Sequence, residues 1–252
     1  MPLLFQSFFW GLVAGSALVL GAGISYFFDL PRRLIAAIMA FGSGVLISAL
    51  SLELMEKAFD KGGFNATALG FLIGAITYTA ANWVLSHKGA KHRKHSGDKQ
   101  ATEAEQSGSG MSIALGALLD GIPESIVIGL SLIAGESVSV VAVCAIFLSN
   151  LPEGLSSAAG MKQAGRSARY IFGVWCGIAV ICGVASLVGY LAFRNCSGEL
   201  VAATTAIAAG AILAMLVDTM VPEAYEREHE FNGLITVLGF LAAFFLSHLG
   251  TA

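Results

Sequence analysis

Long apolar runs alternate with short polar stretches along the whole chain. A helix needs about 20 consecutive apolar residues to cross a bilayer, and eight runs approach or exceed that length. They cover residues 3–28, 34–56, 64–86, 111–135, 137–161, 170–193, 200–222 and 231–250. The pattern predicts an all-α, polytopic membrane protein with eight transmembrane helices. The first run lacks a basic start and is too long for a signal-peptide core, so we interpret it as a transmembrane helix.

The longest polar stretch, residues 87–110, divides the chain. Three predicted spans precede it in residues 1–86, two follow in residues 111–163, and three lie in residues 164–252, a 3+2+3 arrangement. The stretch is rich in Ser and Gly and cannot bury a core, so we expect a flexible, disordered loop. It also carries three histidines, and a short histidine tract can bind transition metals. These loop candidates for metal binding are His87, His92 and His95; a solvated basic loop is the alternative interpretation.

Basic residues outside the runs predict the orientation. Cytoplasmic loops of membrane proteins carry an excess of Lys and Arg. If the N-terminus is outside, three of the 14 basic residues, Lys57, Lys61 and Arg194, lie in outside loops and the other eleven lie in inside loops. We therefore expect both termini outside and the 87–110 loop in the cytoplasm, as in a multi-pass protein of the cell membrane.

The composition agrees with this class. Apolar residues make up 56% of the 252-residue chain and charged residues 12%, at a mean hydropathy of +0.77, whereas a soluble domain is about 25% charged. These values exclude a soluble cytosolic enzyme, a disordered protein and a nucleic-acid-binding protein. The net charge of −3 gives no reason to expect a polyanionic partner. The four cysteines form no C-x-x-C pair, so we expect no disulfide framework.

The few charges deep within the runs are all carboxylates. Glu53, Glu153 and Asp218 lie in one run each, whereas Asp120 and Glu124 share a run, and no Lys or Arg lies deep in any of them. A carboxylate at the bilayer centre costs about 2.5–3.5 kcal/mol, so these groups need an interior that holds water, protons or cations. Without a basic partner in the runs we expect no internal salt bridge, and an all-acidic lining predicts a cation pathway. Protonated carboxyls that hydrogen-bond between helices are the alternative.

The helical rise places these acids at different depths. At 1.5 Å per residue, Glu53 lies about 10 Å outward from the middle of its helix and Asp218 about 10 Å inward from the middle of its own. The other three acids lie near the midplane. We therefore expect an entrance, a centre and an exit. The acidic segment 223–230, which begins at Glu223 and contains His229, would receive the cation inside.

Two neighbouring runs share a motif. ALLDGIPESIVIG at 117–129 aligns without gaps on IFLSNLPEGLSSA at 146–158, and the match pairs Glu124 with Glu153, each directly after a proline. Proline cannot donate, so a carbonyl one turn earlier loses its helical partner. In lipid such a carbonyl needs a neighbour, water or an ion. Each motif thus brings backbone and side-chain oxygens together, as a dehydrated cation requires.

A second, weaker repeat relates residues 41–59 to residues 207–225. The identical pairs are Gly44 and Gly210, Leu50 and Leu216, and Ala58 and Ala224. In the predicted topology the two copies run in opposite directions through the bilayer. Inverted repeats with a site near the midplane are typical of transporters.

In these motifs the chain resembles the ZIP (Zrt/Irt-like) family of divalent-metal transporters. The resemblance covers nearly the whole chain: eight spans, both ends outside, a His-containing loop after the third span, and Pro-Glu motifs on the fourth and fifth. It implies that five positions contribute to the metal site, namely Asp120, Glu124, Ser149, Asn150 and Glu153. It also implies that Glu53 lies near the entrance of the pathway and Asp218 near the exit.

The chain departs from the family motif in ways that bear on the metal. The His-Asn pair of the fourth span is Asp120-Gly121 here, and the fifth span has no His, so the predicted ligands are all oxygens. Oxygen ligands suit Mg²⁺ and Mn²⁺, whereas imidazole suits Zn²⁺ and Fe²⁺. The resemblance implies Zn²⁺ as the transported ion, with Mn²⁺ or Fe²⁺ as alternatives.

We therefore expect a transporter and not an enzyme, with uptake of a divalent metal, no permanently bound cofactor and no nucleic-acid partner. The resemblance also implies a homodimer. Metal would displace protons from the central carboxylates, so flux should depend on pH. A proton-coupled permease for a small organic cation is the alternative, because it also explains buried acids. A membrane-embedded hydrolase is disfavoured, because no His lies deep in a run.

Overall fold

The computed structural model describes residues 2–135, 139–226 and 230–249, and within them it contains helices, turns and loops but no strand. The α-helices are α1 (Leu3–Phe27), α2 (Arg32–Ala49), α3 (Glu56–Leu85), α4 (Ser109–Gly135), α5 (Val140–Gln163), α6 (Ala168–Phe193), α7 (Gly198–Met215), α8 (Val221–Tyr225) and α9 (Asn232–Leu249). Three π-helical turns are η1 (Leu50–Met55), η2 (Ser86–Ala90) and η3 (Leu216–Met220). The predicted all-α class is confirmed.

Five of the described helical segments are long and apolar enough to cross a membrane. They are Leu3–Phe27, Arg32–Ala90, Ser109–Ile133, Ala168–Phe193 and Gly198–Tyr225, and Asn232–His248 is apolar but shorter. Large apolar side chains remain exposed on the outer helices, among them Phe64, Ile76 and Trp83 of α3 and Phe245 of α9. This surface is compatible with a multi-pass membrane protein, and the count of eight spans stays a prediction.

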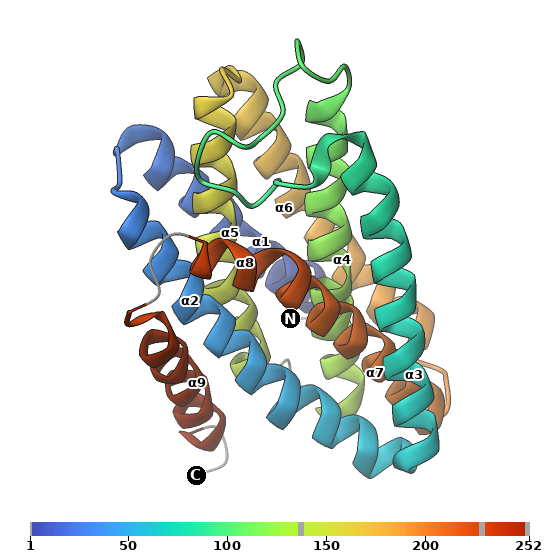
Figure 1. Ribbon diagram of the computed structural model, residues 1–252. Coiled ribbons are helices and arrows are strands. Elements are labelled where there is room, and N and C mark those ends of the chain that lie inside the picture. The colour runs from blue at the N-terminus through green and yellow to red at the C-terminus, as the bar shows by residue number, and fades with distance from the viewer. Residues whose placement is uncertain (1, 136–138, 227–229, 250–252) are drawn as a thin grey trace.

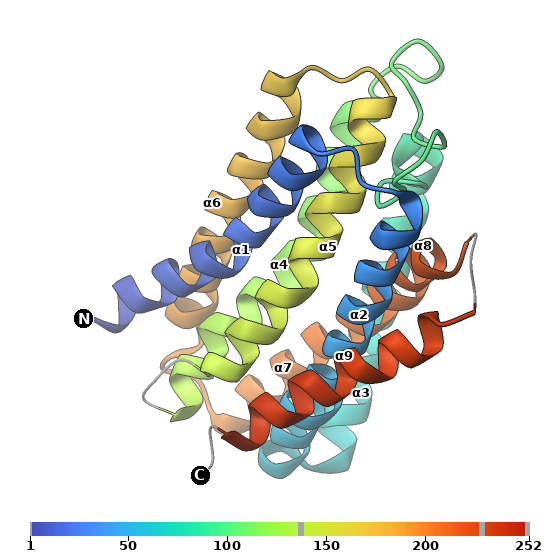
Figure 2. The ribbon, with the colours of Figure 1, turned by 90° about the vertical axis from the view of Figure 1, so that its left-hand side faces the viewer.

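The helices form one bundle with α4 and α5 at its centre. Helices α1 and α6 pack on one side of this central pair, and α2, α3, α7 and α9 pack on the other (Figures 1 and 2). The segment Arg32–Ala90 is not straight, because Gly63 has a positive φ of 67° and breaks the helix where the sequence predicted a loop. The central pair takes part in two core clusters: Val127 of α4 and Leu155 of α5 pack with α2, α3 and α7, whereas other residues of α4 and α5 pack with α1 and α6.

Equivalent positions of the second repeat make equivalent contacts. Gly44 on α2 lies against the backbone of α9, and Gly210 on α7 lies against the backbone of α3; a methyl group at either position would overlap a carbonyl oxygen of the neighbouring helix. The π-turns also correspond, since η1 begins at Leu50 and η3 at Leu216. The weak sequence repeat therefore has a counterpart in the packing. π-turns are frequent at functional sites, and these two contain the acids Glu53 and Asp218.

The connection between α3 and α4 folds back into the bundle, in contrast to the disordered loop that its composition predicted (Figure 1). Residues 93–97 are buried. The Gln100 side chain donates to the carbonyls of Arg93, His95 and Ser157 at 3.0–3.1 Å. The segment is ordered without an apolar core of its own because its polar groups find partners on the central helices.

Candidate cation site at the centre of the bundle

Three carboxylates meet where α4 and α5 lie side by side. Asp120 and Glu124 are 1% exposed and Glu153 is 4% exposed. The four-residue spacing puts Asp120 and Glu124 on one face of α4, and the Pro-Glu motif of α5 supplies Glu153. The central acids of the predicted pathway therefore lie in one buried cluster.

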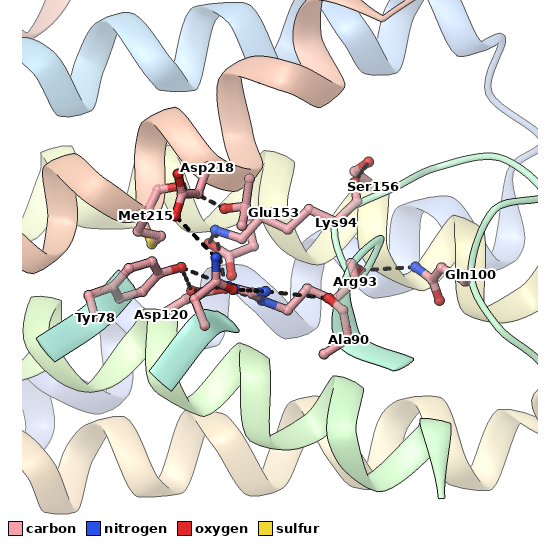
Figure 3. Close-up of polar contacts among 12 residues, drawn as sticks. Tyr78, Ala90, Arg93, Lys94, Gln100, Asp120, Glu153, Ser156, Met215 and Asp218 are labelled. Carbon is pink, nitrogen blue, oxygen red and sulfur yellow. Dashed lines mark hydrogen bonds and ion pairs between the residues drawn. The ribbon is translucent and has the colours of Figure 1, made fainter. Parts of the chain in front are cut away.

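Two basic side chains from the α3–α4 connection enter this cluster (Figure 3). Lys94 lies with its Nζ 2.9 Å from Glu153 Oε2 and 3.4 Å from Asp120 Oδ2. Arg93 donates from Nε and Nη2 to the two carboxylate oxygens of Asp120, both at 2.8 Å. Such a two-pronged guanidinium–carboxylate pair is among the strongest polar contacts in proteins. Arg93 is 1% exposed and Lys94 is 3% exposed.

Two polar residues of α3 extend the network. The hydroxyl of Tyr78 accepts from Arg93 Nη2 at 2.7 Å and donates to Asp120 Oδ1 at 2.6 Å. Asn82 accepts from Arg93 Nη1 at 2.8 Å and donates to Asp218 Oδ2 at 3.1 Å. Asp218, the expected exit acid, is thereby connected to the central cluster through one amide side chain.

The expectation that the buried acids have no basic partner is wrong. It was based on the apolar runs alone, and the partners come from a polar connection that re-enters the bundle. The sequence does contain a signal for this contact: HRKH at 92–95 is a basic cluster, and Tyr78 and Asn82 are polar side chains one turn apart within an apolar run. Neither signal indicates which acids the basic residues would reach.

Glu124 differs from the other two acids, because neither of its carboxylate oxygens has a hydrogen-bond partner among the described residues. A buried carboxylate in this condition is costly unless a proton or a cation satisfies it. It lies within electrostatic range of Glu153 and Asp120. Glu124 is thus a buried acceptor without a hydrogen-bond partner among the described residues, beside two acids that are paired with basic side chains.

The other two positions of the implied metal set use their side-chain donors for backbone carbonyls, one within α5 and one between α5 and α1. Ser149 Oγ donates to the carbonyl of Ile146 on its own helix at 2.9 Å, and Asn150 Nδ2 donates to the carbonyl of Ala14 on α1 at 3.1 Å. Both side chains are buried. Their oxygens keep acceptor capacity, but nothing in the structure directs them to the acids.

A cavity of about 590 Å³ opens on the loop side of the cluster. It brings together the exit acids and the loop histidines that the sequence singled out; its lining includes Asn82, His87, His92, Lys94, His95, Asp218, Glu223 and Glu226. Lys94 belongs both to this lining and to the ion pairs with the central acids. We call this cavity the mouth. His229, expected nearby, lies outside the described residues.

Three groups in the mouth are spaced closely enough to bind a metal: ligand atoms of His95, Glu223 and Glu226 lie within 4.8 Å of one another. However, the N–H of Gly97 donates to His95 Nδ1 at 2.8 Å, so the ring proton resides on Nε2, which faces the two carboxylates. A ligating imidazole instead donates from its second nitrogen. In this conformation the imidazole of His95 points its Nε2 at the carboxylates of Glu223 and Glu226, and this polar contact holds the connection against α8 and the residue that follows it.

The expected entrance acid, Glu53, lies at the other end of the bundle and forms an ion pair with Lys57. The two cavities beside it are small, about 40 and 10 Å³, and the smaller one is lined by apolar residues that include Val127 and Ile146. These two residues lie one helical turn beyond Glu124 and Ser149. The described structure is therefore closed on the Glu53 side and has its mouth on the loop side.

Comparison with known proteins adds no relative. No family model matches the chain, and no curated protein shows significant similarity to it. The resemblance to the ZIP family therefore rests on the motifs and the predicted topology.

Proposed function

We propose that this protein is a transporter of divalent metal cations and that Asp120, Glu124 and Glu153 form its binding site. The observation that carries the proposal is the buried, unpartnered carboxylate of Glu124 beside two further buried acids. Among the described residues, the ion pairs of these three carboxylates involve two fixed positive groups, Arg93 and Lys94. If all three acids are ionised, one negative charge is left for a proton or a cation to neutralise, because an isolated buried charge is unstable.

Around this site we propose the membrane topology that the sequence predicts. It has eight spans in a 3+2+3 arrangement, both termini outside, and opposite orientations for the repeats that contain Gly44 and Gly210. The matching contacts of these two glycines support the repeat, and the basic residues support the orientation. Zn²⁺ is the first candidate for the transported ion, Mn²⁺ and Fe²⁺ are the alternatives, and a homodimer is expected from the resemblance.

In this proposal the cation passes Glu53 and an apolar closure formed around Val127 and Ile146. At the centre it exchanges water for the oxygens of Glu124 and Glu153 and for carbonyls that Pro123 and Pro152 free. It then leaves through the mouth. Since Asp218 and Glu223 line the mouth, a released cation meets further carboxylates there before it reaches solvent.

Metal analysis of the purified protein tests the binding step. We expect the wild-type protein to bind Zn²⁺, Mn²⁺ or Fe²⁺ in competition, and Glu124→Ala and Glu153→Ala to lose most of the bound metal. Glu199→Ala is the matched control, because Glu199 is an exposed acid in the first turn of α7. Equal metal content in all four proteins would contradict a site at the central carboxylates.

A second candidate is a proton-coupled permease for a small organic cation. The specific observation in its favour is that the site already holds an alkylammonium group, from Lys94, and a guanidinium group, from Arg93. A site that binds these groups has the chemistry to bind a free alkylamine or alkylguanidine. Uptake of such a compound into proteoliposomes, driven by a pH gradient in the presence of a metal chelator, would favour this function over metal transport.

A further inference from the structure

We infer that the segment Ala90–Gln100, which we call the plug, is a built-in competitor for the central site. Its Arg93 and Lys94 side chains occupy the carboxylates that the transported cation needs, and they must withdraw before the cation binds. The inference rests on the proposed function. It adds an autoinhibitory element that the ZIP resemblance does not imply.

The position of Lys94 is the first argument. Its ammonium contacts Asp120 and Glu153, while its side chain also lines the mouth. A cation that approaches from the mouth therefore meets Lys94 before it meets either acid. Arg93 lies deeper and uses both oxygens of Asp120. With the plug in place, Glu124 is the one central acid that keeps both oxygens unused among the described residues.

Specific contacts hold the plug backbone in its seat. Ser156 Oγ of α5 donates to the carbonyl of Lys94 at 2.5 Å. Glu223 accepts from the backbone N–H and the hydroxyl of Ser96 at 2.9 and 2.6 Å, and Glu226 pairs with His95. These contacts lie on the mouth side of the acids, so they hold the plug without taking up the central oxygens.

Glycines on the two central helices provide the space for the plug. A methyl group at Gly116 of α4 would overlap the Arg93 side chain, and one at Gly160 of α5 would overlap the carbonyl of His95 and the Gln100 amide. By contrast, Gly173 on α6 has nothing within 4 Å. The two glycines permit a close approach of helix and connection, so the seat is part of the helices and not only of the loop.

If the plug competes with the metal, the apparent metal affinity is proportional to the fraction of time for which the plug leaves the site free. If the plug is withdrawn about one tenth of the time, the apparent metal affinity falls about tenfold. A change that weakens the seat without touching a charged group should restore that affinity. The opposite view, in which Arg93 and Lys94 only neutralise the buried acids, predicts that loosening the plug does not improve metal binding.

The test compares Gly160→Ala with Gly173→Ala, both reconstituted as full chains. We expect hydrogen exchange across residues 91–100 to become faster in Gly160→Ala and to stay at the wild-type rate in Gly173→Ala. We also expect the Zn²⁺ affinity of Gly160→Ala, measured by titration, to rise about tenfold as the competent fraction approaches one. The double substitution Arg93→Gln with Lys94→Gln should raise the Zn²⁺ affinity by a similar factor, because it removes both competing positive groups.

The outcomes separate the plug from the proposed function. Faster exchange in Gly160→Ala with an unchanged or weaker Zn²⁺ affinity would overturn the plug and leave the transporter proposal intact. Unchanged exchange in Gly160→Ala would show that the close approach at Gly160 does not hold the plug in place, and it would overturn the inference. Absence of Zn²⁺, Mn²⁺ and Fe²⁺ binding in the wild type and in every variant would overturn the proposed function and the competitor role together.

Discussion

At the scale of single residues, the two glutamates of the Pro-Glu motifs are in opposite electrostatic situations. Glu153 has the Lys94 ammonium 2.9 Å away, whereas both oxygens of Glu124 have no hydrogen-bond partner among the described residues. The motif alone makes the two acids equivalent, and only the position of the connection distinguishes them. Sequence analysis identified both acids because a carboxylate in an apolar run stands out locally. It missed Arg93 and Lys94 because their contact depends on how a distant connection folds.

Stability measurements on Glu124→Met and Glu153→Met test this difference. Methionine is apolar and similar in volume to glutamate, so Glu124→Met removes an unsatisfied buried acid and should stabilise the protein by about 1–3 kcal/mol. Glu153→Met removes the closest partner of a buried ammonium and should destabilise it, by up to about 3–5 kcal/mol. Thermal unfolding of the two variants and the wild type in one detergent checks the signs. Shifts in the same direction would contradict the assignment of partners.

At the scale of elements, the sequence predicted the helices better than the connection between them. Apolar periodicity and length are local properties, and the described helices lie on all eight predicted runs. The prediction of disorder for 87–110 used composition, which reports whether a segment can build its own core. It does not report whether neighbouring helices offer hydrogen-bond partners. Helix α5 does so here, since the Ser156 hydroxyl donates to the connection and the Ser157 carbonyl accepts from Gln100.

The repeat is testable through its glycines. Gly44→Ala and Gly210→Ala should each destabilise the protein by about 1–3 kcal/mol, because the added methyl groups force apart closely packed backbones. Gly23→Ala is the control, since nothing lies within 4 Å of the position that its methyl group would take. Thermal unfolding of the three variants measures this. A loss at only one of the two repeat glycines would argue that the matched contacts are not equivalent.

The second half of the connection between α3 and α4 is stabilised by the carboxylate of Glu103. Glu103 accepts from Arg166 at 2.7 Å and from the N–H groups of Gly108 and Gly110, and these contacts, that of Arg166 foremost, lower the pKa of Glu103 from 4.5 to about 2. A lowered pKa stabilises the folded segment at pH values above the unfolded pKa, and the effect disappears only as the pH falls towards about 2.

Amide exchange at Gly108 and Gly110, corrected for the intrinsic effect of pH, should therefore be the same at pH 8 and pH 6. Glu103→Gln should speed it at both values, because the charged acceptor is lost. Residues 91–100 should keep their wild-type exchange in this variant, since their contacts lie elsewhere. A marked rise in wild-type exchange between pH 8 and pH 6 would contradict an ionised Glu103.

At the scale of the whole molecule, the described structure has one open and one closed end. The mouth reaches Lys94 from the loop side, and apolar side chains beside Glu53 close the other side. The proposed transport function requires alternation between this state and its opposite, and the repeated packing of α2 with α9 and of α7 with α3 gives two similar halves on which we base such a movement. Sequence reasoning proposed the pathway, but it did not predict which end is closed, because closure depends on packing between distant helices.

The central claim is that the carboxylates of α4 and α5 carry a metal across a membrane. The most direct measurement is the initial rate of Zn²⁺ uptake into proteoliposomes that contain wild-type protein, Glu124→Ala, Glu153→Ala or the control Glu199→Ala. The account predicts saturable uptake by the wild type and the control, and a loss of at least about tenfold in both central variants, because even the groups that support a metal ligand typically contribute about 10–100-fold to metal affinity or activity. Uptake at the same rate in all four preparations, or in none, would contradict it.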